Sequence, residues 1–218
     1  MNIINKIKFK LIRIVKVWKR YRIIYSHYSH LGKDVLSAML KNDGWAACPS
    51  LLEQLAHIMS DLKPKLIVEI GSGVTTMLIA KTKSEESVLF SLDQSKKEIE
   101  KTSQIIKKTS GIIFVYPKQE GVIDYSFYKK LNGRVDLIII DGPTGDRFGS
   151  EAREAFDSII SDKTICIIDD TDRTENDIYA HKLATARNLI KKDFTDPIYK
   201  NQRFSILFPV NIEENLTF

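Results

Sequence analysis

The chain has 218 residues, 43% of them hydrophobic, which is enough to bury the core of one full domain. Its formal net charge is +5, but residues 1–22 hold eight of the 33 basic residues and no acidic one, which leaves 25 basic against 28 acidic residues in the remainder. The positive net charge therefore comes from the N-terminus alone. This distribution of charge excludes a generally basic, nucleic-acid-binding surface.

The N-terminal segment combines these basic residues with one apolar stripe. Apolar residues recur at spacings of three and four from Ile4 to Tyr25, which predicts an amphipathic helix. No apolar run approaches the ~20 residues of a membrane-spanning helix. We expect residues 1–25 to lie on an anionic membrane; the alternatives are packing on the domain, a homodimer seam, or contact with a membrane-bound enzyme. We assign residues 1–31 to this N-terminal helical extension and residues 32–218 to a single folded domain.

Two helices and a loop precede the first strand. Helices are predicted from Asp34 to Leu40 and from Leu51 to Leu62. The loop between them contains Trp45, for which an acceptor pocket and simple packing against the domain are equally good interpretations.

The first predicted strand, Leu66 to Ile70, carries Glu69 near its end and breaks into a turn with Gly71, Ser72 and Gly73. A helix begins at Val74, with Thr75 in its first turn. Glycines let a backbone approach a ligand closely, and a helix start offers free N–H groups. We therefore expect a ligand at this turn.

Three further apolar strands follow, and each ends in an acidic residue. They are Val88 to Asp93, Val135 to Asp141, and Thr164 to the Asp169-Asp170 pair. Such continuous β-branched runs are typical of strands buried on both faces of a parallel sheet. Helical patterns lie between them, at 94–108, 150–160 and 174–192. The alternation predicts a doubly wound α/β fold whose strand-end carboxylates gather along one edge of the sheet.

The two cysteines agree with this fold and indicate the cellular compartment. Cys166 falls within an apolar strand, where it is expected to act as a small buried hydrophobe. Cys48 and Cys166 form neither a disulfide framework nor a metal-binding spacing, so a reducing, cytoplasmic location is expected. Association with the inner face of the membrane would follow from the N-terminal helix.

From about Pro49 onward, the sequence resembles the class I S-adenosylmethionine-dependent methyltransferases. The resemblance is carried by Glu69-Ile-Gly-Ser-Gly73, Ser91-Leu-Asp93 and Asp136-Leu-Ile-Ile-Ile-Asp141-Gly-Pro. It implies a seven-stranded Rossmann-like sheet whose last strand, Arg203 to Phe208, is antiparallel. The segments "EIGSGVTT", "DGPTGDR" and "IIDDTDR" together resemble a bacterial subfamily associated with glycan and polysaccharide biosynthesis.

The resemblance assigns roles along the predicted edge. It implies that S-adenosylmethionine lies over the turn from Glu69 to Gly73, with Thr75 nearby, and that Asp93 accepts hydrogen bonds from both ribose hydroxyls. Asp141 would flank the transferred methyl group. A nicotinamide dinucleotide is the competing cofactor, because Asp93 also has the spacing of a dehydrogenase carboxylate. Against it, Thr76 replaces the third glycine of that motif, and no second domain follows.

The carboxylates after the fourth and fifth main strands have three interpretations. Asp141 with Asp169 or Asp170 would hold Mg²⁺, as in metal-dependent relatives, although those have an Asn where Asp170 stands. Alternatively, Asp169 or Asp170 acts directly as a general base, with a pKa raised by its acidic neighbour. In the third interpretation, Asp170 and Asp172 only cap the helix that begins near Thr174.

Other polar residues are candidates for substrate contacts. Arg147 and Arg153 are placed to meet an anionic acceptor or to lie on a solvated helix face. Adenine contacts are expected among residues 118–120. Tyr125 and Tyr128 would line an acceptor pocket or pack on a sheet edge.

The expected function is O-methylation of a saccharide or lipid-linked glycan at the cytoplasmic membrane face. A soluble, Mg²⁺-dependent enzyme that methylates a small aromatic diol is the second hypothesis. A cofactor-binding scaffold without turnover, in a biosynthetic complex, is the third.

Overall fold

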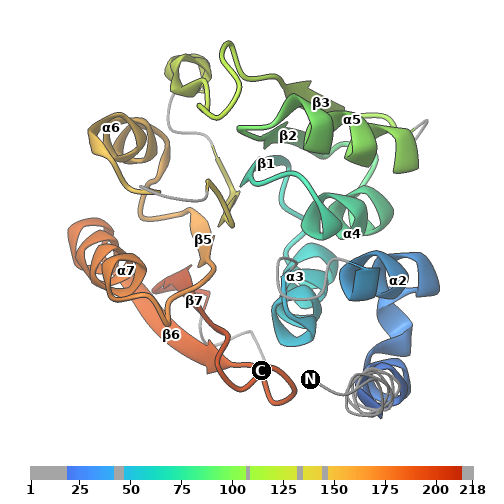
Figure 1. The fold of residues 1–218 in the computed structure, drawn as a ribbon. Helices are drawn as coiled ribbons and strands as arrows, with labels where there is room; N and C mark the ends of the chain where they lie inside the picture. The colour runs from blue at the N-terminus through green and yellow to red at the C-terminus, as the bar shows by residue number, and fades with distance from the viewer. Residues whose placement is uncertain (1–18, 42–46, 107–108, 132–134, 144–146, 213–218) are drawn as a thin grey trace, which may run out of the picture.

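A computed structural model describes residues 19–41, 47–106, 109–131, 135–143 and 147–212. In this part of the chain, one curved sheet of seven strands lies between two layers of helices (Figure 1).

The sheet has the strand order β3-β2-β1-β4-β5-β7-β6. β7 is antiparallel to both of its neighbours, β5 and β6, and the pairs among β3, β2, β1, β4 and β5 are parallel. This confirms the predicted Rossmann-like sheet with an antiparallel last strand. The strands are β1 (Leu66–Ile70), β2 (Val88–Leu92), β3 (Ile112–Val115), β4 (Leu137–Ile140), β5 (Ile165–Ile168), β6 (Leu189–Thr195) and β7 (Arg203–Pro209).

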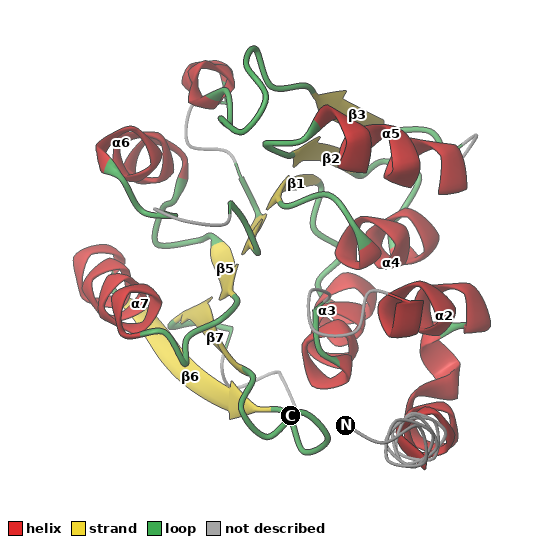
Figure 2. Cartoon of the chain, in the orientation of Figure 1, coloured by secondary structure: helices red, strands yellow, loops and turns green. Residues whose placement is uncertain are grey.

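The helices form two layers, one on each face of the sheet (Figure 2). Helices α2 to α5 lie on one side, while α6, α7 and the short helix η2 lie on the other. Their bounds are η1 (Ser29–Leu31), α2 (Lys33–Lys41), α3 (Pro49–Asp61), α4 (Val74–Thr82), α5 (Lys96–Ile105), η2 (Tyr125–Lys130), α6 (Ser150–Ile159) and α7 (Thr174–Arg187).

The central strands are buried on both faces because both faces are covered by helices. Along β4, Leu137 and Ile139 belong to the apolar cluster under α2–α4, whereas Ile138 and Ile140 belong to the cluster under α6 and α7. Successive side chains of a strand point to opposite faces, so a continuous apolar run serves both layers. Cys166 of β5 is a fully buried free thiol, as its position in an apolar run predicted.

The helical pattern predicted over 174–192 is wrong at its C-terminal end. α7 ends at Arg187, and Asn188 adopts the left-handed conformation (φ 53°) that terminates a helix. β6 then begins at Leu189. Lys191, on this outer strand of the sheet, forms ion pairs with Asp177 (2.8 Å) and Asp193 (2.6 Å). An edge strand with such polar residues lacks the apolar run that identified the central strands.

The N-terminal extension is described only from residue 19 onward. Residues 19–28 are helical, and the buried side chains of Ile24, Tyr28 and Leu31 belong to the core cluster under α2–α4. The guanidinium of Arg20 lies 4.7 Å from the centre of the Tyr199 ring. Most of the predicted amphipathic stripe, together with Trp45, lies outside the described residues. No helix in the described part is long and apolar enough to cross a membrane.

Candidate active site

The carboxyl ends of β1 and β4 meet at the point where the strand order reverses. Gly71 N donates to Leu92 O at 2.8 Å, and Asp141 N donates to Ile70 O at 2.9 Å. Gly71 has a φ of 102°, and a Cβ on it would lie 3.0 Å from the Asp141 carbonyl oxygen. Glycine is therefore required here both by conformation and by space. In open α/β sheets, ligands bind outside this reversal point.

A cavity of about 880 Å³, named here the strand-end cavity, opens at this point. It brings together five of the predicted cofactor residues, which are Gly71, Ser72, Gly73, Asp93 and Asp141. Its opposite wall comes from α2 and α5. These helices contribute polar side chains that no motif had indicated, including Ser37, Lys41, Glu98 and Thr102.

Glu69 and Thr75 lie beneath the glycine turn and do not line the cavity. Glu69 is fully buried, and its carboxyl group accepts hydrogen bonds from the hydroxyls of Thr75, Thr76 and Ser91 at 2.5–2.6 Å. The direct contact of Glu69 and Thr75 with a cofactor stays a prediction, since the structure places both side chains under the turn. These residues instead fix the turn from below, since they connect β1, β2 and the start of α4.

The burial of Glu69 predicts a dependence of stability on pH. Burial raises its pKa to about 7 from 4.5, against the lowering effect of the three hydroxyls. The folded chain thus holds this proton more tightly than the unfolded chain, so the stability it contributes is fully present below about pH 4.5 and is lost as the pH rises through about 7. The loss would be on the order of 3 kcal/mol.

We expect Glu69→Gln to reduce this loss of stability between about pH 5 and pH 8, because glutamine does not ionise. Urea unfolding at several pH values measures it, with Glu86→Gln, an exposed residue before β2, as the matched control. Equal slopes for Glu69→Gln and the control would contradict a buried, titrating Glu69.

The backbone N–H groups of the glycine turn itself, Gly71 to Gly73, are all bonded within the protein. Ser72 N donates to Asp93 Oδ2 at 2.8 Å, and Gly73 N donates to the Thr76 hydroxyl at 2.8 Å. Gly71 N is bonded to β2. The turn therefore presents carboxylate oxygen and Cα atoms to the cavity, and none of its own three amides is free to bind a phosphate.

Asp93 stands at the end of β2, on the wall of the cavity. Its Oδ1 accepts from Ser95 N at 2.7 Å and its Oδ2 from Ser72 N. Each oxygen keeps a second lone-pair direction for a ligand hydroxyl. Burial raises the pKa of Asp93, and these two N–H donors oppose the rise. The arrangement suits the recognition of a vicinal pair of hydroxyl groups.

Two carboxyl groups, the half-buried one of Asp141 and the buried one of Asp169, meet where β4 and β5 end. The side chain of Asp169, which is 7% exposed, is hydrogen-bonded to that of Asp141. Burial and the neighbouring Asp169 raise the pKa of Asp141 well above its usual range, while burial and Asp170 raise that of Asp169 to about 6. Both carboxyl groups therefore hold a proton more readily than an exposed aspartate does.

Arg147 is buried and organises the turns after β4 and β5. Its Nη1 donates to Asp169 O at 3.0 Å, its Nη2 to Asp170 Oδ2 at 3.0 Å, and its Nε to Pro143 O at 3.4 Å. The predicted contact of Arg147 with an anionic acceptor does not fit this geometry, because the guanidinium is occupied by protein oxygens and only 4% exposed. Arg153 is exposed on α6.

Asp141, Asp169 and Asp170 do not fit a metal ion in this arrangement. The carboxylate of Asp170 turns toward Arg147 (3.0 Å) and Arg173 (3.1 Å), so two guanidinium groups occupy the place of a cation. The carboxyl groups of Asp141 and Asp169 face each other. Among the described residues, no group of three or more His, Cys, Asp or Glu side chains is placed to hold a metal. The predicted Mg²⁺ site is therefore not formed by these residues.

The helix-cap interpretation of the same segment is also wrong. α7 has Arg173 at its N-cap without a side-chain cap hydrogen bond. The turn after β5 is held instead by Asn176, whose Nδ2 donates to the carbonyl oxygens of Asp169 (3.2 Å) and Asp170 (3.0 Å). Asp170 itself has a positive φ of 56°. The role of Asp169 or Asp170 as a direct general base stays a prediction.

The residues after β3 are divided between two cavities. Ile123 lines the strand-end cavity, while Lys118 and Gln119 line a second cavity beside it. Glu120 lines neither of them, and its Oε2 accepts a hydrogen bond from Lys96 N at the start of α5 (3.1 Å). Tyr125 and Tyr128 line the second cavity, away from the glycine turn.

Comparison with solved structures identifies the fold. An O-methyltransferase from Streptomyces achromogenes, TomG, in complex with SAM, has a TM-score of 0.64 at 12% identity, over 88% of this chain and 97% of that one. An O-methyltransferase from Bacillus cereus, in complex with SAH, has a TM-score of 0.61 at 13% identity, over 86% and 96%. A putative caffeoyl-CoA O-methyltransferase from Staphylococcus aureus matches at 0.64 and 12%, over 86% and 98%.

No protein-family model and no curated protein matches the sequence. The structural likeness covers nearly the whole length of each neighbour, so the chain has the class I methyltransferase fold.

Proposed function

We propose that the chain is an S-adenosylmethionine-dependent methyltransferase that acts on a hydroxyl group. Support comes from the fold, from the position of Asp93, and from the carboxyl pair at the ends of β4 and β5. Solved neighbours of this fold hold SAM or SAH.

The observation that carries the proposal is the satisfied backbone of the glycine turn. All three N–H groups from Gly71 to Gly73 are bonded within the protein. A dinucleotide needs such donors for its pyrophosphate. A sulfonium cofactor is positively charged and needs none, so it suits a turn beside Asp93 and Asp141. The antiparallel β7 between β5 and β6 also departs from the six-strand parallel order of dinucleotide-binding sheets.

S-adenosylmethionine would supply a methyl group on a sulfonium sulfur. In the transfer, the C–S bond breaks, a C–O bond forms to the acceptor, and the acceptor hydroxyl loses its proton. The chain's own task is to orient the acceptor, exclude water and receive this proton.

The Asp141–Asp169 pair is the proposed proton acceptor. Asp141 lines the cavity and contacts the buried Asp169, so a proton taken at the cavity wall would be shared with a second carboxyl group. Arg147 fixes both turns that carry the pair. No metal is required for this step, since two guanidinium groups already compensate the third carboxylate, Asp170.

Replacing either member of the pair should remove turnover while sparing cofactor binding. We expect Asp141→Asn and Asp169→Asn to lower the rate of methyl transfer by ~10²–10⁴-fold, the usual contribution of a positioned base. The affinity for S-adenosylhomocysteine should stay within about threefold of the unchanged protein, because Asp93 is kept and the neutral sulfur of this ligand does not need the charge of Asp141. Labelled methyl transfer into saccharide and glycolipid fractions measures turnover, and calorimetry measures affinity.

Asp172→Asn is the matched control, because Asp172 is an exposed carboxylate in the same turn. If Asp141→Asn and Asp169→Asn keep full turnover, or lose structure and cofactor affinity together, the pair is not the base.

The acceptor is proposed to be a saccharide or a lipid-linked glycan, as the three sequence segments "EIGSGVTT", "DGPTGDR" and "IIDDTDR" suggest. A small aromatic diol is the alternative, and turnover that requires added Mg²⁺ would favour it. Binding of S-adenosylhomocysteine without methyl transfer to any acceptor would favour the third hypothesis, a cofactor-binding scaffold without turnover.

Association with the cytoplasmic face of the membrane is part of the proposal and is supported by the eight basic residues within 1–22. Each Lys or Arg near an anionic surface contributes about 1 kcal/mol, so removal of residues 1–18 should abolish co-sedimentation with phosphatidylserine vesicles. This truncation keeps Ile24 and Tyr28, which pack in the core. Unchanged sedimentation would favour the alternative contacts of this segment.

A further inference from the structure

α3 begins without a cap of its own. Its N-cap residue is Cys48, whose side chain makes no capping hydrogen bond, and Pro49 follows at the first helical position. The first N–H groups of a helix have no partner within the helix, and the helix dipole favours a carboxylate beside them. The first turn of α3 holds no acidic residue. A carboxylate that stabilises this helix end must therefore come from elsewhere in the chain.

Asp196, in the connection between β6 and β7, provides this carboxylate. Its Oδ2 accepts hydrogen bonds from Ser50 N (3.0 Å) and from the Ser50 hydroxyl (2.8 Å), across 146 positions of the chain. Its Oδ1 accepts from Ile198 N (2.8 Å) and Tyr199 N (2.6 Å), which folds the connection into a turn. Asp196 has no exposed surface, so its carboxylate depends on these four donors in place of water.

Residues 47–50, which Asp196 holds through the start of α3, border the active site. Ala47 is 2% exposed and lines the strand-end cavity. The thiol of Cys48 is also buried, and its pKa is raised by burial first and then by the charge of Asp169, with a smaller effect from Asp196. Cys48 therefore lies near both carboxylates, and the segment connects Asp196 to the carboxyl pair.

We propose that Asp196 is a positioning residue for methyl transfer: it holds residues 47–50 against the strand-end cavity, where this segment keeps water from the Asp141–Asp169 pair. The inference rests on the proposed function and adds to it a residue that does not line the cavity. A catalytic group needs the correct geometry, and a displacement of about 1 Å can lower the rate by ~10²-fold. Without Asp196, the start of α3 would be free to move away from the pair.

The only two cysteines of the chain report on this segment directly. Cys48 lies within it, whereas Cys166, fully buried in β5, reports on opening of the whole domain. The rate at which iodoacetamide labels each thiol is measured by mass spectrometry on the full chain, without cofactor or acceptor. The ratio of the two rates separates local movement of residues 47–50 from general loss of stability.

Asp196→Asn should raise the labelling rate of Cys48 by ~10–100-fold relative to that of Cys166. Asparagine keeps one acceptor oxygen and replaces the other with an NH2 group, which faces N–H and O–H donors and leaves them without a partner. Ser50→Ala removes only one of the four hydrogen bonds and should give a smaller increase, of ~3–10-fold. This milder variant gives a result even if Asp196→Asn does not fold.

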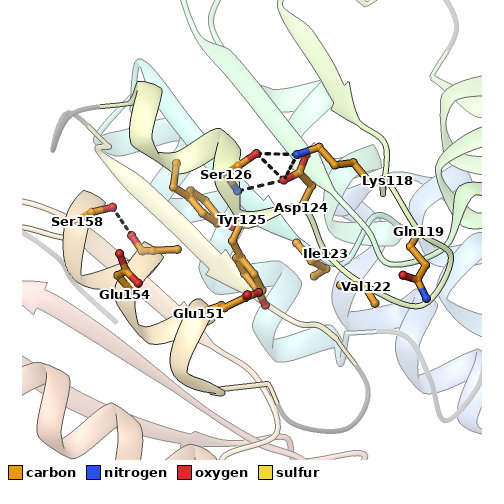
Figure 3. Close-up of a pocket in the computed structure, with 12 residues that line it drawn as sticks. Lys118, Gln119, Val122, Ile123, Asp124, Tyr125, Ser126, Glu151, Glu154 and Ser158 are labelled. Atoms are coloured by element: carbon orange, nitrogen blue, oxygen red, sulfur yellow. Dashed lines mark hydrogen bonds and ion pairs between the residues drawn. The ribbon is translucent and has the colours of Figure 1, made fainter.

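Asp124→Asn is the matched control, because Asp124 makes the same contacts at another helix. It accepts hydrogen bonds from Ser126 N (3.1 Å) and from the Ser126 hydroxyl (2.5 Å) at the start of η2, beside the second cavity (Figure 3). η2 and α3 lie on opposite faces of the sheet. We therefore expect Asp124→Asn to leave the labelling rate of Cys48 unchanged.

A second readout separates positioning from a purely structural role. In fully folded Asp196→Asn, labelled methyl transfer should fall by ~10–100-fold, while the affinity for S-adenosylhomocysteine stays within about threefold. The affinity is kept because Asp93 and the glycine turn are held by hydrogen bonds of their own. Asp124→Asn should keep full transfer.

Unchanged labelling of Cys48 in Asp196→Asn, or equal increases at Cys48 and Cys166, would overturn the inference. Full transfer by an Asp196→Asn protein whose Cys48 reacts rapidly would also overturn it, since the segment would then be structural only. Absence of S-adenosylhomocysteine binding by the unchanged protein would overturn the proposed function and the role in transfer with it. The labelling ratio would still decide whether Asp196 holds residues 47–50, so the two failures are distinguishable.

Discussion

Arg147→Ala should destabilise the protein by about 3–5 kcal/mol, the usual cost of removing one partner of a buried ion pair. The substitution leaves the carbonyl oxygens of Pro143 and Asp169 without their donor, and it leaves Asp170 with Arg173 alone. It also removes the positive charge of Arg147, which lowers the pKa of both Asp141 and Asp169. Without that charge, the pKa of each carboxyl group should rise further. Unfolding in urea measures the loss.

The matched control is Arg153→Ala, on the exposed face of α6, which should change stability by less than about 0.5 kcal/mol. Arg147→Lys should recover only part of the loss, because a lysine keeps the charge but does not bridge three acceptors. If Arg147→Ala is as stable as Arg153→Ala, the turns after β4 and β5 are not held together by this guanidinium.

Asp93→Ala should weaken S-adenosylhomocysteine binding by ~10–100-fold, the loss expected for charged hydrogen bonds to two hydroxyl groups. The same carboxylate supports the turn through Ser72 N and Ser95 N, so part of the loss would come from a displaced backbone. Asp93→Asn separates the two effects, since it keeps the shape and one acceptor oxygen. A loss of intermediate size is expected for it.

The control for both is Asp162→Ala, an exposed carboxylate in the turn before β5. Equal affinity in Asp93→Ala and in this control would show that Asp93 does not contact the cofactor.

The central fold could be predicted from the sequence because it depends on local patterns. Apolar runs such as Leu137–Ile140 identify strands covered on both faces, and the glycine turn after β1 identifies the strand end that binds ligands. Asp93 and Asp141 were placed in the same cavity by this reasoning alone. β6 was partly missed, because its exposed and charged residues lack an apolar period.

The contacts inside the site could not be predicted, because they join residues far apart in the sequence. The hydroxyl of Ser91 that binds Glu69 is 22 residues away, and the Asp170 partner of Arg147 is 23 residues away. No spacing rule connects such pairs, so Glu69 was placed at the ligand and Arg147 at the acceptor. The contribution of α2 to the wall of the strand-end cavity was also missed, because Ser37 and Lys41 belong to no sequence motif.

One measurement tests the account most directly: calorimetric titration of the full chain with S-adenosylhomocysteine and, separately, with NAD. The satisfied amides of the glycine turn and the free lone pairs of Asp93 predict binding of S-adenosylhomocysteine, weakened in Asp93→Asn, and no binding of NAD. Added Mg²⁺ should leave the titration unchanged, because Arg147 and Arg173 already compensate Asp170. Binding of NAD, or of neither ligand, would contradict the proposed cofactor and with it the proposed reaction.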